Sequence, residues 1–408
     1  MKASERAMPS SAVSAVTARP GNRDALIVRS ADGRRELDLG RDVHALMGLV
    51  FDRIDLAGAV DNVRRCVAQR RPCFLSTPNV NFVAAAAGDA AFRDSVLHSN
   101  LSVADGFPIV RAARWMGIDL PGRVAGADIF ERLQSAARSP QRPPIKLFLF
   151  GGPPGIAAVA AARLNAQDRG VECVGHDEGG FGDVQDMSSP STIERINDSG
   201  ADFVLVALGA RKGQAWIEHN RSRLQAPVIS HLGAVINFAA DSVARAPGWM
   251  QRAGLEWVWR IYQEPQLWRR YASDGGLLVR TLFTAILPSA ARRALAIASA
   301  GAGAAPGFCI DTSTPGLALF ALSGDWRAGA DTLALRSALA RLLRDGTRVE
   351  IDLSAAPALD SALWGLIALI DAWQVAPRVV RAASLSDRTL RADLRAHGMQ
   401  YLLDRPGA

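Results

Sequence analysis

The sequence has few cysteines, no secretion signal and no evident metal-binding pattern. Its four cysteines, Cys66, Cys73, Cys173 and Cys309, are scattered without a Cys-x-x-Cys pair. This spacing favours buried, reduced thiols in a cytosolic protein over a disulfide framework or a zinc site. The first 24 residues lack the apolar core of a signal peptide. No short Asp-x-Asp pair is spaced to hold a divalent cation, so we predict neither a metal nor a cofactor.

No stretch of the sequence is both long and apolar enough for a transmembrane helix. The most apolar window, residues 276–301, is interrupted by a proline and several arginines. Its longest uncharged run, residues 281–291, falls well short of the roughly 18–20 residues that span a bilayer. The sequence therefore predicts a soluble or peripheral protein.

The rest of the composition is that of a globular protein with a basic balance. The chain has 408 residues, 49% hydrophobic and 21% charged, with a net charge of +7. This length fits two domains and a tail, and the charge admits nucleic acid, anionic lipid or phosphorylated substrates as partners. Residues 241–293 hold eight arginines against four acidic residues, interleaved with tryptophans. That mixture suits a membrane interface with anionic head groups, although a nucleic-acid surface has a similar composition.

Residues 41–275 alternate short apolar runs with helical patterns. Strands separated by helices of ten or more residues predict a Rossmann-like, mostly parallel α/β sheet. In such sheets, ligands bind at the carboxyl ends of the strands. We interpret residues 1–40 as a flexible N-terminal arm. The expected strands are residues 72–76, 145–150, 171–174, 203–208 and 226–231.

The remaining sequence divides into two parts. Residues 276–307 are predicted to be an amphipathic segment that runs into an Ala/Gly-rich linker. Residues 308–404 are predicted to form a small α/β domain that ends with a further strand and helix. Its earlier elements are expected at residues 316–322, 330–344, 348–353 and 361–373.

One polar motif follows a predicted strand, and a second follows a change from polar to apolar residues. The first contains Thr77, Asn79 and Asn81, which can face a sugar or a phosphate or can simply cap a helix. The second contains Asp105 followed by Gly106. A carboxylate before a flexible glycine is a candidate general base, although Asp-Gly is also a common turn.

Two further features are typical of phosphate binding. A fixed guanidinium at Arg123 would be a good partner for a leaving diphosphate, and a solvated arginine is the alternative. The strand-GGPPG-helix element at residues 147–156 includes Gly151 and Gly152. Backbone amides at a helix N-terminus favour phosphate, but the motif is neither GxGxxG nor a P-loop.

Six ordered motifs in the first unit resemble the WecG/TagA/CpsF family of bacterial glycosyltransferases. The resemblance runs from about residue 45 to 275. It implies an inverting sugar transfer from a UDP-sugar donor, often UDP-N-acetylmannosamine and in some members another UDP-sugar. The implied acceptor is linked to polyprenyl diphosphate. The motifs are TPNVNFV (77–83), ADGFPIVRAARWMG (104–117), RVAGADIFERL (123–133), LFLFGG (147–152), DFVLVALG (202–209) and RAPGWMQRAGLEWVWRIYQEP (245–265).

This resemblance also assigns roles to residues. Asp105 occupies the family's proposed catalytic-base position, and Arg123 matches an arginine thought to assist catalysis. Residues 241–275 match an appendage that helps to close the site and meets the membrane. Arg245, Arg269 and Arg270 are expected at lipid head groups. The expected substrate-binding residues are Thr77, Asn79, Asn81, Gly106, Gly151, Gly152, Gly209, Lys212, Gln214 and Arg260.

The sequence departs from the family pattern at the nucleotide end of the expected pocket. The family usually has Gly-Ser/Ala-Pro-Lys-Gln-Glu-x-Trp after the strand that ends at Leu208, whereas here Gly213 and Gln214 replace the Gln and Glu. A common Phe-Asp in the next loop is Ile236-Asn237. These changes leave the donor open. They also define an alternative, a catalytically degenerate regulatory protein that binds a nucleotide sugar.

The C-terminal unit resembles a STAS domain in the segments FALSGDW (320–326), RVEIDLS (348–354) and LDSALWGL (359–366). In that family a Ser or Thr after the Asp, at a helix N-terminus, can be phosphorylated, and Ser361 stands there. A phosphate would gain helix-dipole stabilisation and alter a binding surface. The alternative is that Ser361 caps its helix. The resemblance implies a protein partner for this unit.

These expectations combine into one hypothesis. The chain would be a cytoplasmic enzyme, peripheral at the inner membrane, in exopolysaccharide, capsule or other envelope polysaccharide synthesis. Nucleic acid is not an expected partner, because the basic residues lie in the Trp-rich appendage and not in a recognised nucleic-acid motif.

Overall fold

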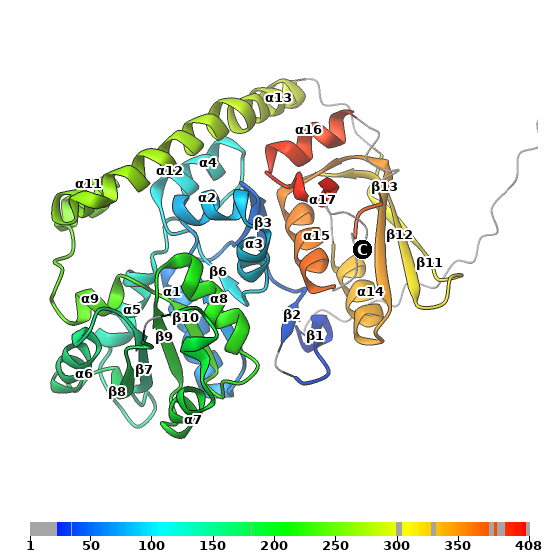
Figure 1. Ribbon diagram of the computed structural model, residues 1–408. Coiled ribbons are helices and arrows are strands. Elements are labelled where there is room, and N and C mark those ends of the chain that lie inside the picture. The colour runs from blue at the N-terminus through cyan, green and yellow to red at the C-terminus, as the bar shows by residue number, and fades with distance from the viewer. Residues whose placement is uncertain are drawn as a thin grey trace, which may run out of the picture.

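The computed structural model describes residues 23–33, 35–180, 182–298, 304–327, 332–374, 379–381 and 388–404. Figure 1 shows a larger α/β unit, a smaller unit built on a second sheet, and a long helical rod that crosses above both.

The larger unit is built on a six-stranded sheet in the order β6-β5-β10-β9-β7-β8. Every neighbouring pair in it is parallel. The predicted Rossmann-like α/β sheet is thus confirmed. The strands are β5 (Cys73–Ser76), β6 (Leu101–Ser102), β7 (Ile145–Gly151), β8 (Val171–Asp177), β9 (Phe203–Ala207) and β10 (Val228–His231).

Helices cover both faces of this sheet. In β7, Leu147 and Leu149 belong to the core on one face, and Phe148 and Phe150 belong to the core on the other. Because both faces are dry, the strands are continuous apolar runs instead of alternating patterns. The first face carries α1 (Leu56–Gln69), α5 (Gly126–Ser135), α6 (Ile156–Ala166) and α9 (Val235–Ala239); the second carries α7 (Pro190–Asp198) and α8 (Ala210–Asn220).

A third layer lies beyond the end of the sheet, next to the rod. It consists of the hairpin β3 (Val43–Leu46) and β4 (Leu49–Asp52) with α2 (Val80–Gly88), α3 (Ala90–Leu97) and α4 (Phe107–Trp115). Asp52 ties this layer to the sheet. Its carboxylate pairs with buried Arg41 at 2.7 Å and accepts a hydrogen bond from the backbone N–H of Ser102.

The helical rod follows the sheet. Helix α12 (Trp268–Thr281), the π-helical segment η4 (Leu282–Ile286) and α13 (Leu287–Ala298) run on without a break. The expected amphipathic segment at 276–307 is therefore a continuation of α12 and not a separate element. Of the expected linker, residues 299–303 lie outside the described residues. The rod is preceded by α10 (Gly248–Ala253), α11 (Glu256–Gln263) and η3 (Pro265–Leu267).

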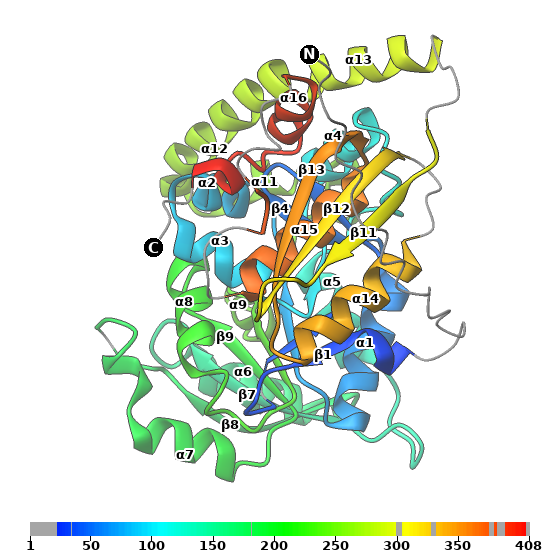
Figure 2. The ribbon, with the colours of Figure 1, turned by 90° about the vertical axis from the view of Figure 1, so that its right-hand side faces the viewer.

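The smaller unit has a three-stranded sheet in the order β11-β12-β13, with β11 antiparallel to β12 and β12 parallel to β13 (Figure 2). The expected strands and helices of residues 316–373 are present as β12, α14, β13 and α15, whereas β11 was not foreseen. The elements are β11 (Gly307–Asp311), β12 (Leu317–Trp326), α14 (Leu333–Arg344), β13 (Arg348–Leu359), α15 (Ser361–Trp373), α16 (Arg388–Ala396) and α17 (Tyr401–Asp404).

The structure differs from the expected flexible arm at residues 1–40. Residues 1–22 lie outside the described residues, but from Arg23 the chain forms η1 (Arg23–Leu26) and the antiparallel pair β1 (Ile27–Arg29) and β2 (Glu36–Asp38). Their buried side chains join the core of the smaller unit. Their burial depends on a partner some 300 residues away, which sequence composition cannot reveal.

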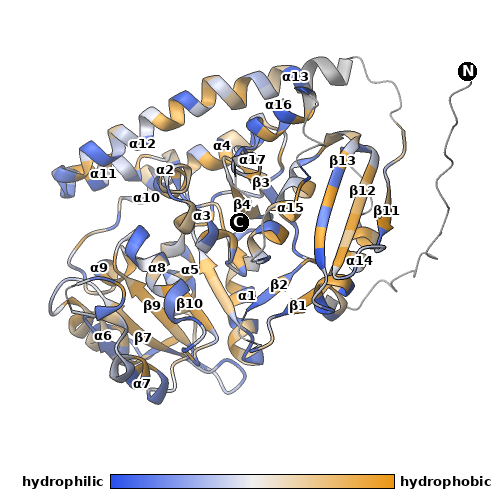
Figure 3. Cartoon of the chain, turned by 45° about the vertical axis from the view of Figure 1, so that its right-hand side comes forward, coloured by the Kyte–Doolittle hydropathy of each residue, from blue (hydrophilic) through white to orange (hydrophobic). Residues whose placement is uncertain are grey.

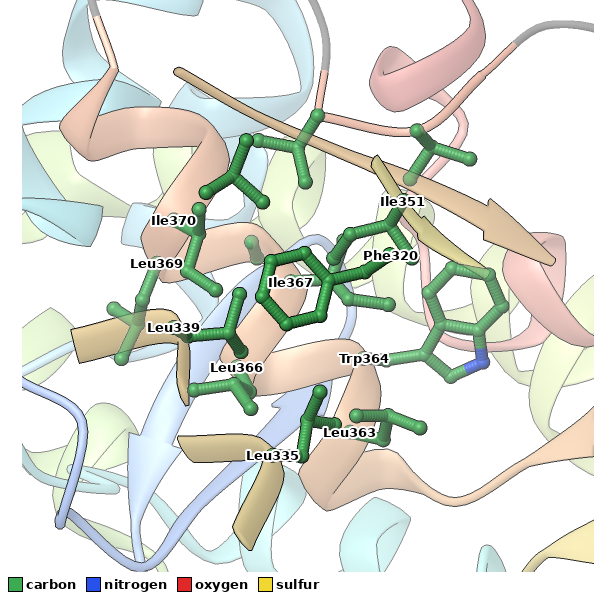
Figure 4. Packing of buried hydrophobic residues seen from close by; sticks show 14 of the residues in the cluster. Phe320, Leu335, Leu339, Ile351, Leu363, Trp364, Leu366, Ile367, Leu369 and Ile370 are labelled. Carbon is green, nitrogen blue, oxygen red and sulfur yellow. The ribbon is translucent and has the colours of Figure 1, made fainter. Parts of the chain in front are cut away.

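Helix α15 lies between the small sheet and the larger unit (Figure 1). It packs closely on β3, where a Cβ on Gly365 would lie 3.2 Å from the backbone oxygen of Val43. Figure 4 shows the core around Trp364, Phe320 and Ile367. Because that core also includes Val43 and Ala45, the smaller unit is packed as part of the whole molecule and not as a free tail.

Candidate active site

Six parallel strands bring their carboxyl ends to one edge of the sheet. We call this edge the catalytic edge, and define it by the segments that follow the strands. It gathers Thr77 after β5, Asp105 after β6, Gly151 at the end of β7, Gly209 after β9 and His231 at the end of β10. Several predicted residues from distant motifs thus reach one place, as parallel α/β sheets require.

Asp105 is the most perturbed carboxylate of this edge. Its backbone N–H donates to the backbone oxygen of Pro78 at 3.0 Å, and its carboxylate accepts from the backbone N–H of Gly126, the first residue of α5. Burial raises the pKa of Asp105 to about 7, while neighbouring Arg123 opposes the rise. A carboxyl group with that pKa is about half ionised at neutral pH, which suits a general base.

Arg123 lies among carboxylates from three elements. Its Nε is 3.8 Å from Oδ1 of Asp105, and its Nη2 is 3.2 Å from carboxylate oxygens of Asp128 and of Glu256. Its side chain is 11% exposed, and the guanidinium lies 5.7 Å from the centre of the Phe107 ring. Arg123 is therefore a fixed, partly desolvated cation beside Asp105 and not a solvated surface arginine.

The appendage closes over this group. Glu256 of α11 supplies one of the carboxylates at Arg123, and the sequence reading missed it because no local pattern marks it. Arg245 was expected at lipid head groups but instead pairs with Asp128 and Glu131 of α5. Arg245 is therefore held against α5 by two carboxylates, and its side chain is 24% exposed.

The other appendage arginines divide into two kinds. Arg260 pairs with Glu264 at 2.6 Å and lies 5.9 Å from the centre of the Phe238 ring, so it faces the larger unit. Arg269 and Arg270 are exposed on α12, next to Trp268 and Tyr271 respectively.

The TPNVN motif has a largely structural explanation. Asn79 caps α2, because its side chain accepts a hydrogen bond from the backbone N–H of Phe82. The amide of Asn81 donates to Asp274 of α12 at 3.2 Å and thereby ties α2 to the rod. Thr77 is buried at the catalytic edge, where a Cβ on Gly126 would lie 3.1 Å from its methyl group. Thr77 thus contacts Gly126, the residue whose backbone N–H binds Asp105.

Oxygen atoms of the protein itself already bind backbone N–H groups of the GGPPG turn. The backbone N–H of Gly152 donates to the backbone oxygen of Ala207, and that of Gly155 donates to the carboxylate of Glu178 at 2.6 Å. A carboxylate therefore already holds this helix N-terminus. Gly151 has φ +89°, and a Cβ there would lie 2.6 Å from Leu208, so it serves close packing of β7 and β9. The turn is a weaker phosphate site than the sequence indicated.

The N-terminus of helix α8 is the other candidate phosphate site. No side chain of the described residues caps it, and it follows Gly209, which has φ +78°. The first backbone N–H groups of a helix have no partner within the helix and attract anions. Lys212 lies in this turn and donates to the backbone oxygen of Gly182 at 2.9 Å. At Gly106, φ is +157°, which fits the sharp turn from β6 into α4.

Some of the buried polar atoms that lack a hydrogen-bond partner among the described residues lie at this edge. They include Oε1 of Gln214 and Nε2 of His231. Gln214 is fully buried and its amide donates to Oγ of Ser76 at 2.9 Å. His231 was not predicted, and a single histidine in an apolar strand gives no sequence signal. Buried polar atoms are normally satisfied, so their presence here marks a place for a ligand.

No three His, Cys, Asp or Glu side chains in the described part of the chain are grouped to hold a metal ion, and none of its helices has the length and apolarity of a membrane span. The expected independence from metal and cofactor remains a prediction.

Comparison with known proteins decides the family. A model described as "Glycosyl transferase WecG/TagA/CpsF family" matches residues 44–292, more than half of the chain. The chain belongs to the WecG/TagA/CpsF family. It is accordingly a glycosyltransferase by family. The match spans the sheet, the catalytic edge and most of the rod, and it stops before the smaller unit.

Two similar proteins share a printed name, N-acetylglucosaminyldiphosphoundecaprenol N-acetyl-beta-D-mannosaminyltransferase. The protein from Bacillus subtilis (strain 168) is 28% identical over 207 residues, which cover 51% of this chain and 78% of the relative. The protein from Bacillus spizizenii (strain ATCC 23059 / NRRL B-14472 / W23) is 26% identical over 205 residues, covering 50% of this chain and 77% of the relative. Both WecG/TagA/CpsF relatives thus align along most of their length.

Proposed function

We propose that this chain transfers a sugar, with inversion, from a UDP-sugar to a polyprenyl-diphosphate-linked acceptor in envelope, capsule or exopolysaccharide synthesis. The observation that carries the proposal is the pairing of Asp105, whose pKa is raised to about 7, with Arg123 at the catalytic edge. The names of the two relatives support an acceptor carried on undecaprenyl diphosphate and a donor of the N-acetylmannosamine type.

The proposed chemistry is a single displacement. Ionised Asp105 takes the proton from the acceptor hydroxyl, and that oxygen attacks the anomeric carbon as its bond to the diphosphate breaks. UDP leaves with the bonding electrons. Arg123 and the first backbone N–H groups of α8 stabilise the negative charge that develops on it. One displacement at one carbon inverts the anomeric configuration.

The test is UDP release from a panel of UDP-sugars with a short-chain polyprenyl-diphosphate-sugar acceptor. Asp105→Asn should lower turnover by about 10²–10⁴-fold, the usual contribution of a positioned general base. Wild-type activity should fall about tenfold for each pH unit below pH 7, because protonated Asp105 cannot accept the proton. Asp168→Asn, on an exposed side chain far from the edge, is the matched control.

A folded Asp105→Asn protein with near wild-type turnover would refute this role. Saturable UDP-sugar binding by the wild-type protein without any UDP release would favour the alternative, a regulatory protein that only senses a nucleotide sugar. The change to Gly213 and Gln214 in the first turns of α8 makes that outcome worth testing.

The rod supports peripheral attachment at the cytoplasmic side of the inner membrane. Apolar side chains on α10–α13 are exposed and are interleaved with exposed arginines such as Arg269, Arg270 and Arg280, and Figure 3 shows this mixture along the rod. Aromatic side chains between basic ones suit anionic head groups. The most exposed large apolar side chains of these helices are Trp249, Tyr262, Trp268, Val279 and Phe283.

We also propose that the smaller unit is a STAS-like domain with a protein partner. Its support is the strand order β11-β12-β13 with α14 as the connection between β12 and β13. Asp360 caps α15, so the alternative prediction that Ser361 caps this helix is wrong. The Ser361 hydroxyl instead lies 2.9 Å from Nδ1 of His44 on β3. A phosphate on Ser361 would therefore act on the contact between the smaller unit and β3.

A further inference from the structure

His231 is the last residue of β10, which lies between β5 and β9 in the middle of the sheet. Its side chain is 8% exposed, and Nε2 is buried without a hydrogen-bond partner among the described residues. Burial lowers its pKa to about 4, and no neighbouring charge contributes to the shift. The imidazole is therefore neutral at physiological pH.

Two glycines leave bare backbone beside this ring. A Cβ on Gly213 would lie 2.3 Å from Cδ2 of His231, and a Cβ on Gly233 would lie 3.1 Å from Nε2. Any other residue at Gly213 would collide with the imidazole. Gly213 stands in the first turns of α8, where glycine weakens a helix and where its φ is not positive, so backbone conformation does not require it. The space for the ring is the remaining reason for glycine there.

The end of β10 contacts the segment that holds the catalytic group. Leu232 follows His231, and its side chain would lie 2.4 Å from a Cβ on Gly126. Gly126 is the residue whose backbone N–H binds Asp105. The residue after His231 therefore packs against the residue that binds Asp105. Gln214, whose Oε1 also lacks a partner among the described residues, follows Gly213 directly on α8.

We infer that His231 is a specificity-determining residue whose Nε2 forms a hydrogen bond with an uncharged hydroxyl or amide of the nucleotide sugar. The inference rests on the proposed function. A neutral imidazole carries one N–H donor, one acceptor nitrogen and no charge, so Nε2 fits a hydroxyl or amide better than a diphosphate. The diphosphate has a better partner in the cationic Arg123 and in the N-terminus of α8.

The first test measures donor affinity and turnover. His231→Leu removes the polar atom and should raise KM for the UDP-sugar about tenfold or more, with kcat changed much less, because the lost bond is made before the reaction. His231→Gln retains a hydrogen-bonding group and should recover a substantial part of that loss. His219→Gln, on an exposed part of α8, is the matched control.

The second test separates the ring's packing from its binding role. Gly213→Ala should lower the unfolding temperature, because its Cβ would lie 2.3 Å from the ring. Gly213→Ala with His231→Ala should restore the unfolding temperature and still bind UDP-sugar weakly. A double variant with wild-type donor affinity would overturn the inference.

The failures are distinguishable. If the wild-type protein releases UDP and is sensitive to Asp105→Asn, yet His231→Leu keeps wild-type KM, only the role of His231 is refuted. If the wild-type protein neither binds a UDP-sugar nor releases UDP, the proposed function fails, and the role of His231 fails with it. Isothermal titration with UDP-sugars measures donor affinity, and thermal unfolding measures stability. Neither measurement depends on turnover.

Discussion

The catalytic edge and the core around Trp364 treat buried polar atoms in opposite ways. At the edge, Nε2 of His231 and Oε1 of Gln214 have no partner among the described residues, and burial raises the pKa of Asp105 to about 7. In the core, the indole N–H of fully buried Trp364 donates to Asp393 at 2.8 Å. These two buried atoms at the edge are therefore candidates to bind a ligand, whereas the buried indole N–H of Trp364 is satisfied within the protein.

The largest expected effect on stability comes from a substitution in the core around Trp364. Trp364→Ala should lower the free energy of unfolding by about 3–5 kcal/mol, because it removes a fully buried aromatic side chain. Urea unfolding measures the loss, and Trp257→Ala, on a half-exposed tryptophan, should change it little. Since the core includes Val28 and Val43, the N-terminal hairpins should unfold in the same transition. Separate transitions would contradict a shared core.

The next largest effect is a gain in stability, at the catalytic edge. Asp105→Asn should raise the free energy of unfolding at pH 8 by up to about 4 kcal/mol, the value that corresponds to the whole pKa shift. The pKa of Asp105 is raised from 3.8 to about 7. The folded protein therefore holds a proton that the unfolded chain has released, and wild-type stability falls as pH rises through that window. The advantage of the variant should shrink toward zero near pH 4.

Urea unfolding of the wild-type and Asp105→Asn proteins at pH 4, 6 and 8 checks this prediction. Asp168→Asn, with a side chain 79% exposed, is the control and should show no such trend. A difference that stays constant across pH would show that Asp105 is not the source. Together with its loss of turnover, a more stable variant would show that the site sacrifices stability for chemistry.

The smallest effect on stability belongs to the rod and to α11, which precedes it. Replacing Tyr262, Trp268 and Phe283 with serine should change the free energy of unfolding by about 0.5 kcal/mol or less per site, because these side chains are 55–78% exposed. The same variant should lose most of its flotation with vesicles that contain anionic phospholipid. Val159→Ser, exposed on α6, is the control. Undiminished flotation would argue against the rod as the membrane face.

The sequence predicted most of the central sheet because its strands carry their own signal. Continuous apolar runs predicted β5, β7, β8, β9 and β10, and Thr77 follows β5. Asp105 and Arg123 were predicted from their own motifs, because the two-residue strand β6 before Asp105 was not foreseen. It missed β1 and β2, since a short strand of mixed residues depends on what it packs against. It also placed Arg245 at head groups, because the carboxylates that bind it lie more than 100 positions away.

The sequence by itself determined the α/β class, the order of the motifs and the residue types at the catalytic edge, because these follow from local periodicity and from chemistry that each motif carries. Only the tertiary structure decided that Glu256 reaches Arg123, that Gly213 makes room for His231, and that the N-terminal hairpins complete the core of the smaller unit. Each of these depends on which distant surfaces meet. Contact between segments far apart in the chain is fixed by packing of the whole molecule, and no local pattern encodes it.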